Sequence, residues 1–146
     1  MATFTLERTT PADMETVFDV LTDHRGYADI SAPRKVVLER EGDPAPNGVG
    51  AIRQIHIAGP PLREEVTVYD RPGRFSYKLL SGLPVRDHVG QVTLSHSGGG
   101  THISYRVETH PKIPVVGHLA VAGTRVAITA LLRDIVKAAE KRSAAR

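Results

Sequence analysis

The sequence contains no cysteine and no tryptophan, and aromatic residues make up only 5% of its 146 positions. The absence of cysteine excludes disulfide scaffolds, thiol nucleophiles, thiolate zinc sites and iron-sulfur clusters, and it suits a reducing compartment. The scarcity of aromatic side chains argues against a stacking platform for single-stranded nucleic acid. We therefore expect a cytoplasmic protein whose function does not depend on sulfur chemistry.

A large excess of charge of one sign is also missing. Nineteen Lys and Arg residues stand against sixteen Asp and Glu residues, which gives a formal net charge of +3. Part of the excess lies near the C-terminus, where cations complement a helix dipole. These residues are Arg125, Arg133, Lys137, Lys141, Arg142 and Arg146. The sequence thus predicts no nucleic-acid partner.

Long hydrophobic runs are absent as well. The first ten residues hold no apolar stretch of signal-peptide length. The most apolar stretch, Leu119–Leu132, is interrupted by Arg125 and is too short to cross a bilayer, so we expect no transmembrane segment. With 40% hydrophobic residues, the chain is expected to form one domain, residues 1–146, with a full core and an internal cavity.

The chain begins with a strand pattern followed by a helix pattern. Phe4 and Leu6 alternate with polar residues, which predicts a first strand. Thr10 followed by Pro11 is typical of a helix start with Thr10 as the N-cap, and apolar residues then recur at helical spacing up to Leu21. A second short helix is expected over 27–30, after a break at Gly26.

The middle of the chain, over 35–109, has period-two hydrophobicity. Five segments that combine Gly with Pro, Asn, Asp or Ser interrupt it, as in consecutive hairpins: 43–48, 59–61, 70–73, 81–84 and 97–100. The pattern predicts an α+β chain in which six strands form a meander, seven with the first strand, followed by one long C-terminal helix from Pro114 to about Ala139. The N-terminal half of that helix is apolar nearly all round and is expected to be buried on several sides.

The turns also predict which side chains share a face, because side chains alternate along a strand with a period of two. The turn at 97–100 places His96 opposite Thr101, and the turn at 81–84 places Tyr77 opposite His88. Two neighbouring rows result on the inner face: Thr109, His88, Tyr77, Val66 and Arg53 in one, and Arg86, Leu79, Glu64 and Ile55 in the other. Burying these polar groups without partners costs on the order of several kcal/mol each.

Three interpretations of this polar group remain open. It anchors the oxygenated end of an apolar ligand, which we favour. It is catalytic, with His88 as general acid or base and Tyr77 as oxyanion donor. Or it is structural, an ion pair of Glu64 with Arg53 or Arg86. The predicted ligand-contacting set adds an apolar wall to the polar residues: Arg53, Glu64, Val66, Val68, Phe75, Tyr77, Leu79, Arg86, His88, Val92 and Tyr105.

Neither a metal nor a cofactor is expected. None of the seven histidines stands in an HxH, HxxxH or HExxH spacing. The segment SGGG over 97–100 lacks the lysine and the following helix of a phosphate-binding loop, so we interpret it as a hairpin turn.

The order of a strand, two short helices, a six-strand meander and a long helix resembles the helix-grip fold of the START and Bet v 1-like (SRPBCC) superfamily. More narrowly, it resembles small bacterial polyketide cyclase/dehydrase and lipid-transport-like proteins. Five segments carry the resemblance: PADMETVFDVLT (11–22), GVGAIR (48–53), EVTVYDRP (65–72), FSYKLL (75–80) and GGTHISY (99–105). The resemblance implies a pocket between sheet and C-terminal helix, entered near 27–33, 82–84 and the start of that helix.

The resemblance also implies a function. We expect binding or transport of a small hydrophobic ligand, such as a lipid, a polyketide or an isoprenoid-like molecule, by a monomer or homodimer. One alternative is a cyclase or dehydratase of polyketide-type substrates that uses His88 and Tyr77. Another is a quinone-binding or partner-binding module that uses an exposed strand edge or the basic helix end.

Overall fold

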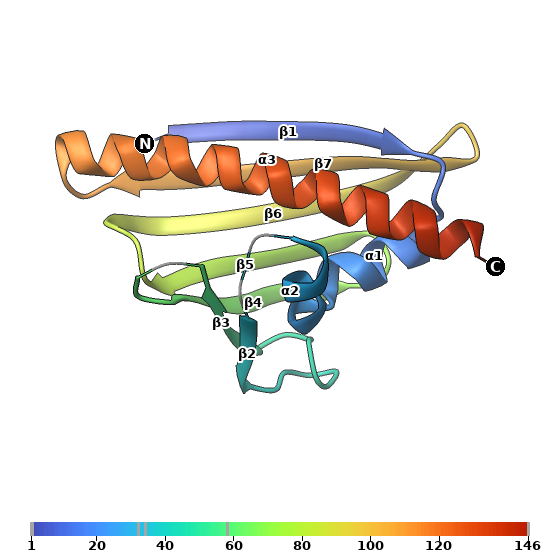
Figure 1. The fold of residues 1–146 in the computed structure, drawn as a ribbon, viewed down its shortest axis with the longest axis horizontal. Coiled ribbons are helices and arrows are strands. Elements are labelled where there is room, and N and C mark those ends of the chain that lie inside the picture. The colour runs from blue at the N-terminus through green and yellow to red at the C-terminus, as the bar shows by residue number, and fades with distance from the viewer. Residues whose placement is uncertain (1, 32, 34, 58, 146) are drawn as a thin grey trace.

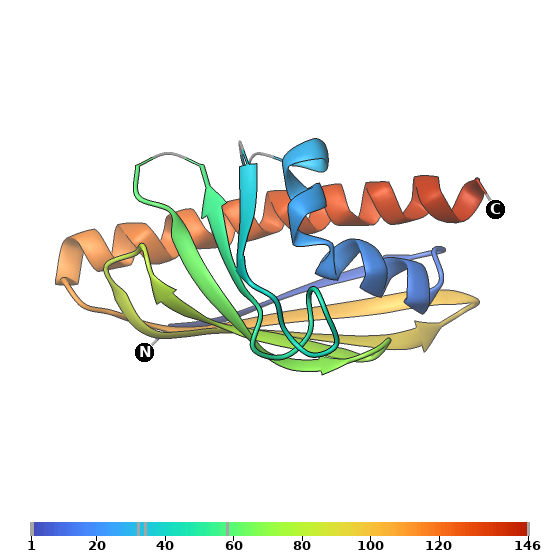
Figure 2. The same cartoon turned by 90° about the horizontal axis from the view of Figure 1, so that it is seen from below.

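Seven antiparallel strands form one curved sheet in the order β1-β7-β6-β5-β4-β3-β2, and a long helix lies along its concave face (Figures 1 and 2). The computed structural model describes residues 2–31, 33, 35–57 and 59–145. Its elements are β1 (Ala2–Thr10), α1 (Met14–Thr22), the 3-10 turn η1 (His24–Gly26), α2 (Tyr27–Ile30), β2 (Lys35–Arg40), β3 (Ile52–His56), β4 (Leu62–Asp70), β5 (Arg74–Ser81), β6 (Val85–Ser97), β7 (Gly100–Pro111) and α3 (Pro114–Ala144). The predicted α+β helix-grip fold is confirmed.

The start of α1 lies three residues later than its sequence pattern suggests. Asp13 is the N-cap, because its carboxylate accepts the backbone N–H of Thr16 at 3.1 Å. Thr10 instead ends β1, and its hydroxyl donates to Glu140 of α3 at 2.8 Å. The hydrogen bond that sequence reasoning assigned to a helix cap therefore ties β1 to the last turns of α3.

Helix α3 begins at Pro114, as predicted, but its N-terminal half is not buried. Val115, Leu119 and Val126 are 72%, 68% and 71% exposed, whereas Leu132 and Ile135 in the C-terminal half are buried. The reason is that α1 and α2 flank only the C-terminal half of α3 (Figure 2). By length and composition, α3 is the one helix in the described part of the chain that is able to cross a membrane.

Two strand registers differ from the predicted ones by two residues. Tyr77 lies opposite Gly90 rather than His88, and Arg53 lies opposite Glu64 rather than Val66. A shift of two residues keeps every side chain on its predicted face. The register of β6 and β7 near the 97–100 turn is confirmed, with His96 opposite Thr101.

Two bulges turn predicted inward residues away from the inner face. A register shift between Arg86 and Val89, with Asp87 at a φ of 50°, leaves the Arg86 side chain exposed. A second shift follows Val66, so that Tyr69 rather than Val68 pairs with Phe75. The inward predictions for Arg86 and Val68 are therefore wrong, since a bulge reverses the alternation of faces and no local pattern marks it.

Candidate functional site

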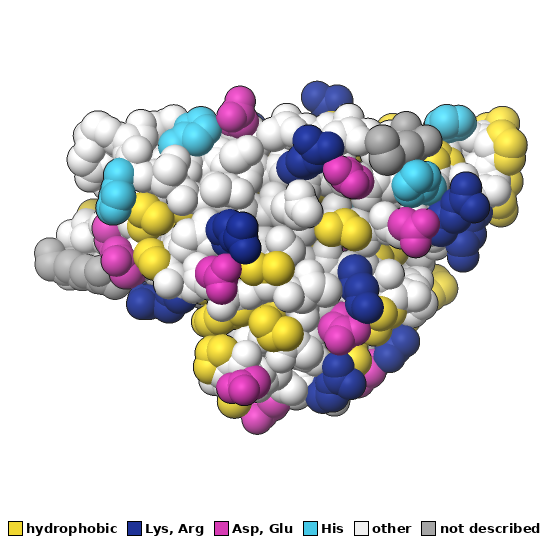
Figure 3. Space-filling model, turned by 180° about the vertical axis from the view of Figure 1, so that it is seen from behind, with side chains coloured by type: hydrophobic (Ala, Val, Ile, Leu, Met, Phe, Trp, Pro, Cys, Tyr) yellow, Lys and Arg dark blue, Asp and Glu magenta, His cyan; other side chains and the backbone are white. Residues whose placement is uncertain are grey.

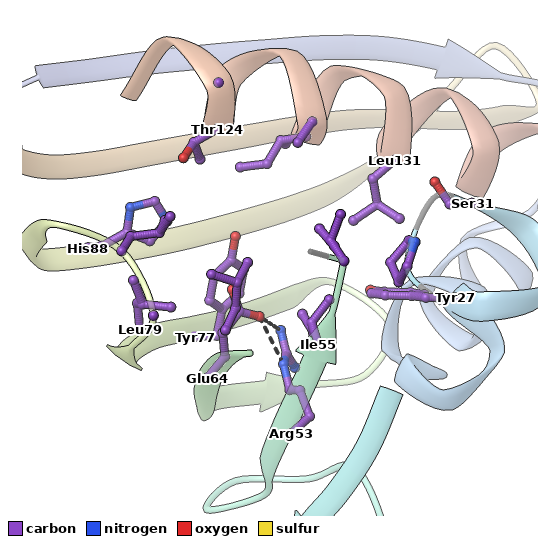
Figure 4. A pocket seen from close by; sticks show the side chains of 18 of the residues that line it. Tyr27, Ser31, Arg53, Ile55, Glu64, Tyr77, Leu79, His88, Thr124 and Leu131 are labelled. Atoms are coloured by element: carbon purple, nitrogen blue, oxygen red, sulfur yellow. Dashed lines mark hydrogen bonds and ion pairs between the residues drawn. The ribbon is translucent and has the colours of Figure 1, made fainter. Parts of the chain in front are cut away.

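A cavity of about 450 Å³ lies between the concave face of the sheet and α3. Figure 4 shows its polar side chains on the side of the sheet that faces α3. They are Arg53 on β3, Glu64 on β4, Tyr77 on β5 and His88 on β6. Seven predicted site residues line it: Arg53, Glu64, Phe75, Tyr77, Leu79, His88 and Tyr105. Helix α3 closes the opposite side mainly with small side chains, among them Ala120, Gly123 and Ala127.

The other predicted site residues lie elsewhere. Val66 and Val92 are buried in the hydrophobic core, 1% and 2% exposed, and are not among the residues that line the cavity. Val68 and Arg86 are also outside the lining because of the two bulges. Besides Phe75 and Leu79, the apolar wall of the cavity contains residues outside the predicted set, such as Leu21, Ile55, Leu62, Leu83 and Leu131.

A buried ion pair forms the polar centre of the cavity wall. Arg53 Nη2 and Nε donate to the same carboxylate oxygen, Oε1 of Glu64, at 2.7 and 3.0 Å. The two side chains are 2% and 9% exposed, and they are direct cross-strand neighbours on β3 and β4. Because both bonds go to Oε1, Oε2 remains available as an acceptor within the described part of the chain.

The Arg53 guanidinium is enclosed on its other sides by rings. Its carbon lies 5.5 Å from the centre of the Phe75 ring and 5.0 Å from that of Tyr77. Burial by itself lowers the pKa of Arg53, but Glu64 and Tyr27 more than offset this, so its pKa lies above the usual value. The guanidinium therefore stays charged and fixed in one position.

His24 completes this cluster, and sequence reasoning missed it. Its Nε2 lies 2.5 Å from Nη1 of Arg53, and the residue is 1% exposed. Burial, together with the adjacent Arg53, holds the pKa of His24 well below its usual value. The ring is therefore neutral, and its nitrogen accepts a hydrogen bond from the Arg53 guanidinium. His24 belongs to a three-residue turn, where no periodicity predicts the direction of a side chain.

Tyr77 and Tyr105 meet above the ion pair, where their hydroxyl groups form a hydrogen bond. Burial and the nearby Glu64 carboxylate raise the pKa of Tyr77, and burial and Tyr77 raise that of Tyr105. Both are therefore neutral hydroxyls that donate and accept hydrogen bonds. Tyr77 has room only because residue 90 is glycine: a Cβ there would lie 2.4 Å from Cζ of the ring.

His88, which lines the cavity, and Thr109, which lies outside its lining, each hold a buried polar atom without a partner. Among the described residues, His88 Nδ1 and Thr109 Oγ1 are the buried side-chain atoms without a hydrogen-bond partner. Burial lowers the pKa of His88, against the opposing effect of Glu64, so the imidazole is neutral near pH 7. Unsatisfied buried polar atoms are uncommon in folded proteins, and a catalytic or binding role is one explanation for them.

Within the described ranges, no three His, Asp or Glu side chains converge in a way that would hold an ion. The polar cluster contains a cation, two neutral imidazoles and two phenols around one carboxylate, which suits an oxygen-bearing organic group better than a metal.

A family model described as polyketide cyclase/dehydrase and lipid transport matches residues 1–143. The chain belongs to this family. No curated protein matches the sequence significantly.

Several solved structures share the fold of this member of the polyketide cyclase/dehydrase and lipid transport family. It is similar to the di-domain ARO/CYC StfQ from the steffimycin biosynthetic pathway (TM-score 0.79, 15% identity), covering 97% of this chain and 51% of that one. It is also similar to Ara h 8.0201, with a TM-score of 0.73 and 17% sequence identity over 99% of this chain and 99% of that one. A norcoclaurine synthase from Thalictrum flavum matches with a TM-score of 0.70 at 17% identity, over 93% of this chain and 94% of that one. At these identities the likeness establishes the fold alone.

Proposed function

We propose that this protein binds or transports a small apolar ligand with an oxygen-bearing end, of the lipid, polyketide or isoprenoid class. The observation that supports this most is the cavity of about 450 Å³, which has apolar walls and one convergent polar cluster. Small-molecule pockets have this composition and volumes of about 300–1,000 Å³. A cytoplasmic location belongs to the same proposal, because a chain without cysteine suits a reducing compartment.

The polar cluster selects the kind of oxygen that the ligand presents. Glu64 Oε2 accepts a hydrogen bond from a ligand hydroxyl, and the Tyr77–Tyr105 pair donates a hydrogen bond to a carbonyl or hydroxyl oxygen. His88 offers a further neutral nitrogen. Because Glu64 is negatively charged and Arg53 is already paired with it, an anionic ligand end is disfavoured. A neutral alcohol, ketone or phenol fits the cluster best.

Gly123 allows a direct test of this site. It lines the cavity from α3, and a Cβ at this position meets no atom within 4 Å. Gly123→Phe should therefore attach its side chain without a clash at Cβ, occupy part of the cavity with its ring, and weaken binding of the neutral fluorophore N-phenyl-1-naphthylamine by at least about tenfold, or roughly 1.4 kcal/mol. The measurement is a fluorescence titration, with native mass spectrometry to detect a co-purified ligand.

Ala122→Phe is the matched control, because it adds the same ring one residue earlier, at an exposed position outside the cavity lining. Its affinity for the probe should stay near that of the wild type. Gly123→Phe should melt no lower than the wild type, since glycine within a helix is disfavoured by up to about 1 kcal/mol relative to alanine. Equal probe binding by both variants, or a wild type that takes up no apolar molecule, would contradict the proposal.

His88 favours one alternative, a cyclase or dehydratase. Its lowered pKa keeps the imidazole neutral and able to accept a proton, and the phenol of Tyr77 stays protonated and able to stabilise an oxyanion. In that case His88→Ala should abolish turnover of a polyketide-type thioester while probe affinity changes only a few-fold. Because burial lowers the pKa of His88, the imidazole should still be neutral at pH 6.5, the ordinary histidine value. The rate should therefore be retained at pH 6.5 and fall only when the pH is lowered further. Parallel loss of turnover and affinity would make His88 an anchor only.

A further inference from the structure

The outward face of the N-terminal half of α3 is apolar. Val115, Leu119 and Val126 are 72%, 68% and 71% exposed, and Val116 is 51% exposed. We call these four residues the α3 apolar stripe. Residues 115, 119 and 126 are separated by four and seven positions, so they project from one side of the helix. A row of large exposed apolar side chains of this kind marks an interaction surface.

Cations border the stripe. Arg8 of β1 and Arg125 and Arg133 of α3 line one shallow hollow together with Val126. The Arg125 guanidinium lies over the Phe4 ring at 5.6 Å, and Arg133 is 3.5 Å from its neighbour Asp134. The sequence contains no Asp or Glu from residue 109 to residue 133. This surface is therefore positive, and few acidic groups compensate it.

The opposite side of the molecule is different. Figure 3 shows Lys and Arg next to Asp and Glu over the outer face of the sheet. There Arg63 pairs with Glu39 and Arg106 with Glu108, each at 2.7 Å. The face that carries α3 therefore differs from this outer face, because its cations lie beside large exposed apolar side chains and neither Arg8 nor Arg125 forms an ion pair among the described residues.

The stripe also lies beside an opening of the cavity, because Gly123 and Ala127 line the cavity and are exposed. Leu119 and Val126 are the immediate neighbours of Ala120 and Ala127, which line the cavity. Ile57, which directly follows β3, is 41% exposed and lines the cavity as well. A surface that covered the stripe would therefore face the route by which a ligand enters.

We propose that the N-terminal half of α3 docks on an anionic phospholipid bilayer, with the α3 apolar stripe in the interfacial region and Arg8, Arg125 and Arg133 on the lipid phosphates. Helices with an apolar face and flanking cations bind membranes in this way. The helix lies on the bilayer rather than crossing it, because Ile128 and Leu132 hold its other face against the rest of the fold. Docking in this orientation lets an apolar ligand pass between bilayer and cavity, a consequence that rests on the proposed function.

Charge decides between a bilayer and a second copy of the chain. In a two-fold dimer built on this face, each patch meets itself. The arginines of one copy would then approach those of the other, and acidic residues to compensate them are lacking between residues 109 and 133. An anionic bilayer supplies the opposite charge over the whole surface.

The test is co-sedimentation of the full chain with extruded vesicles. Vesicles of phosphatidylcholine with about 30% phosphatidylglycerol should bind the protein, pure phosphatidylcholine should bind it at least about tenfold more weakly, and added salt should weaken binding. Leu119→Glu/Val126→Glu and Arg125→Gln/Arg133→Gln should each reduce binding about tenfold. Val37→Glu is the matched control, because Val37 is also exposed, at 39%, but lies on β2, and it should bind as the wild type does.

Several results would overturn the docking proposal. These are no binding to anionic vesicles, binding that the Leu119→Glu/Val126→Glu variant retains, or a dimer in analytical ultracentrifugation that this variant dissociates. Probe binding without vesicles separates this proposal from the proposed function. The Leu119→Glu/Val126→Glu variant should bind N-phenyl-1-naphthylamine as tightly as the wild type does. A wild type that binds vesicles but not this probe would contradict the proposed function and would still support docking on the bilayer.

Discussion

Replacing Glu64 by leucine should lower the free energy of unfolding by about 3–5 kcal/mol, because the substitution leaves Arg53 charged and buried without its counter-ion. For a chain of this size the loss corresponds to a melting temperature lower by roughly 10 °C or more. The double variant Arg53→Met/Glu64→Leu should recover much of the loss, since an apolar pair of similar volume needs no charge compensation. Recovery should be partial, because His24 loses its donor. Thermal and urea unfolding of the three proteins measure both effects.

The same sheet contains a matched control for this prediction. Glu39 on β2 and Arg63 on β4 form an ion pair across β3 at 2.7 Å, but their side chains are 30% and 36% exposed. Water solvates either charge when the other is removed, so Glu39→Leu should change stability far less than Glu64→Leu. Equal losses in the two variants would show that burial is not what makes the Arg53–Glu64 pair important.

Adding one methyl group at Gly90 should destabilise the protein by about 1–3 kcal/mol, the usual cost of overpacking a core. The reason is that the new Cβ would lie 2.4 Å from Cζ and 2.6 Å from the hydroxyl oxygen of Tyr77. The Tyr77 ring would have to move, which breaks its hydrogen bond to Tyr105 and weakens the polar end of the cavity. Thermal melts and probe titrations of Gly90→Ala should therefore both change.

A second substitution tests whether contact with Tyr77 causes the loss of stability in Gly90→Ala. Tyr77→Leu removes the atoms that the Gly90 methyl group would strike, so Gly90→Ala should cost much less in a Tyr77→Leu background than in the wild type. Gly123→Ala is the matched control, because its Cβ meets nothing within 4 Å. An equal cost of Gly90→Ala in both backgrounds would mean that backbone conformation at position 90, and not contact with Tyr77, is responsible.

Much of the fold was predictable because its signals are local. Period-two alternation, turn residues and helical spacing are properties of short segments, and they yielded the order of elements and the inner face of the sheet. A register error of two residues did no harm to the site, since it preserves which face a side chain occupies. Arg53, Glu64, Tyr77 and His88 therefore reached the cavity wall as predicted, although Tyr77 and Arg53 have different cross-strand partners.

The failures share a physical cause. The bulges that expose Arg86 and turn Val68 away change the count of residues by one, and one residue is enough to reverse a face. The burial of α3 was overestimated because the apolar sequence of a helix does not indicate how much of the helix the other elements cover. His24 was missed because the direction of its side chain depends on how a short turn packs against β3.

The sequence by itself thus determined the helix-grip architecture, the absence of cysteine chemistry and a polar group on the inner face of the sheet, because each follows from residue type and local spacing. Only the tertiary structure decided that Arg53 pairs with Glu64 and His24, that Gly90 makes room for Tyr77, and that the apolar start of α3 faces outward. These features depend on contacts between residues far apart in the chain, and the packing of the whole fold sets such contacts.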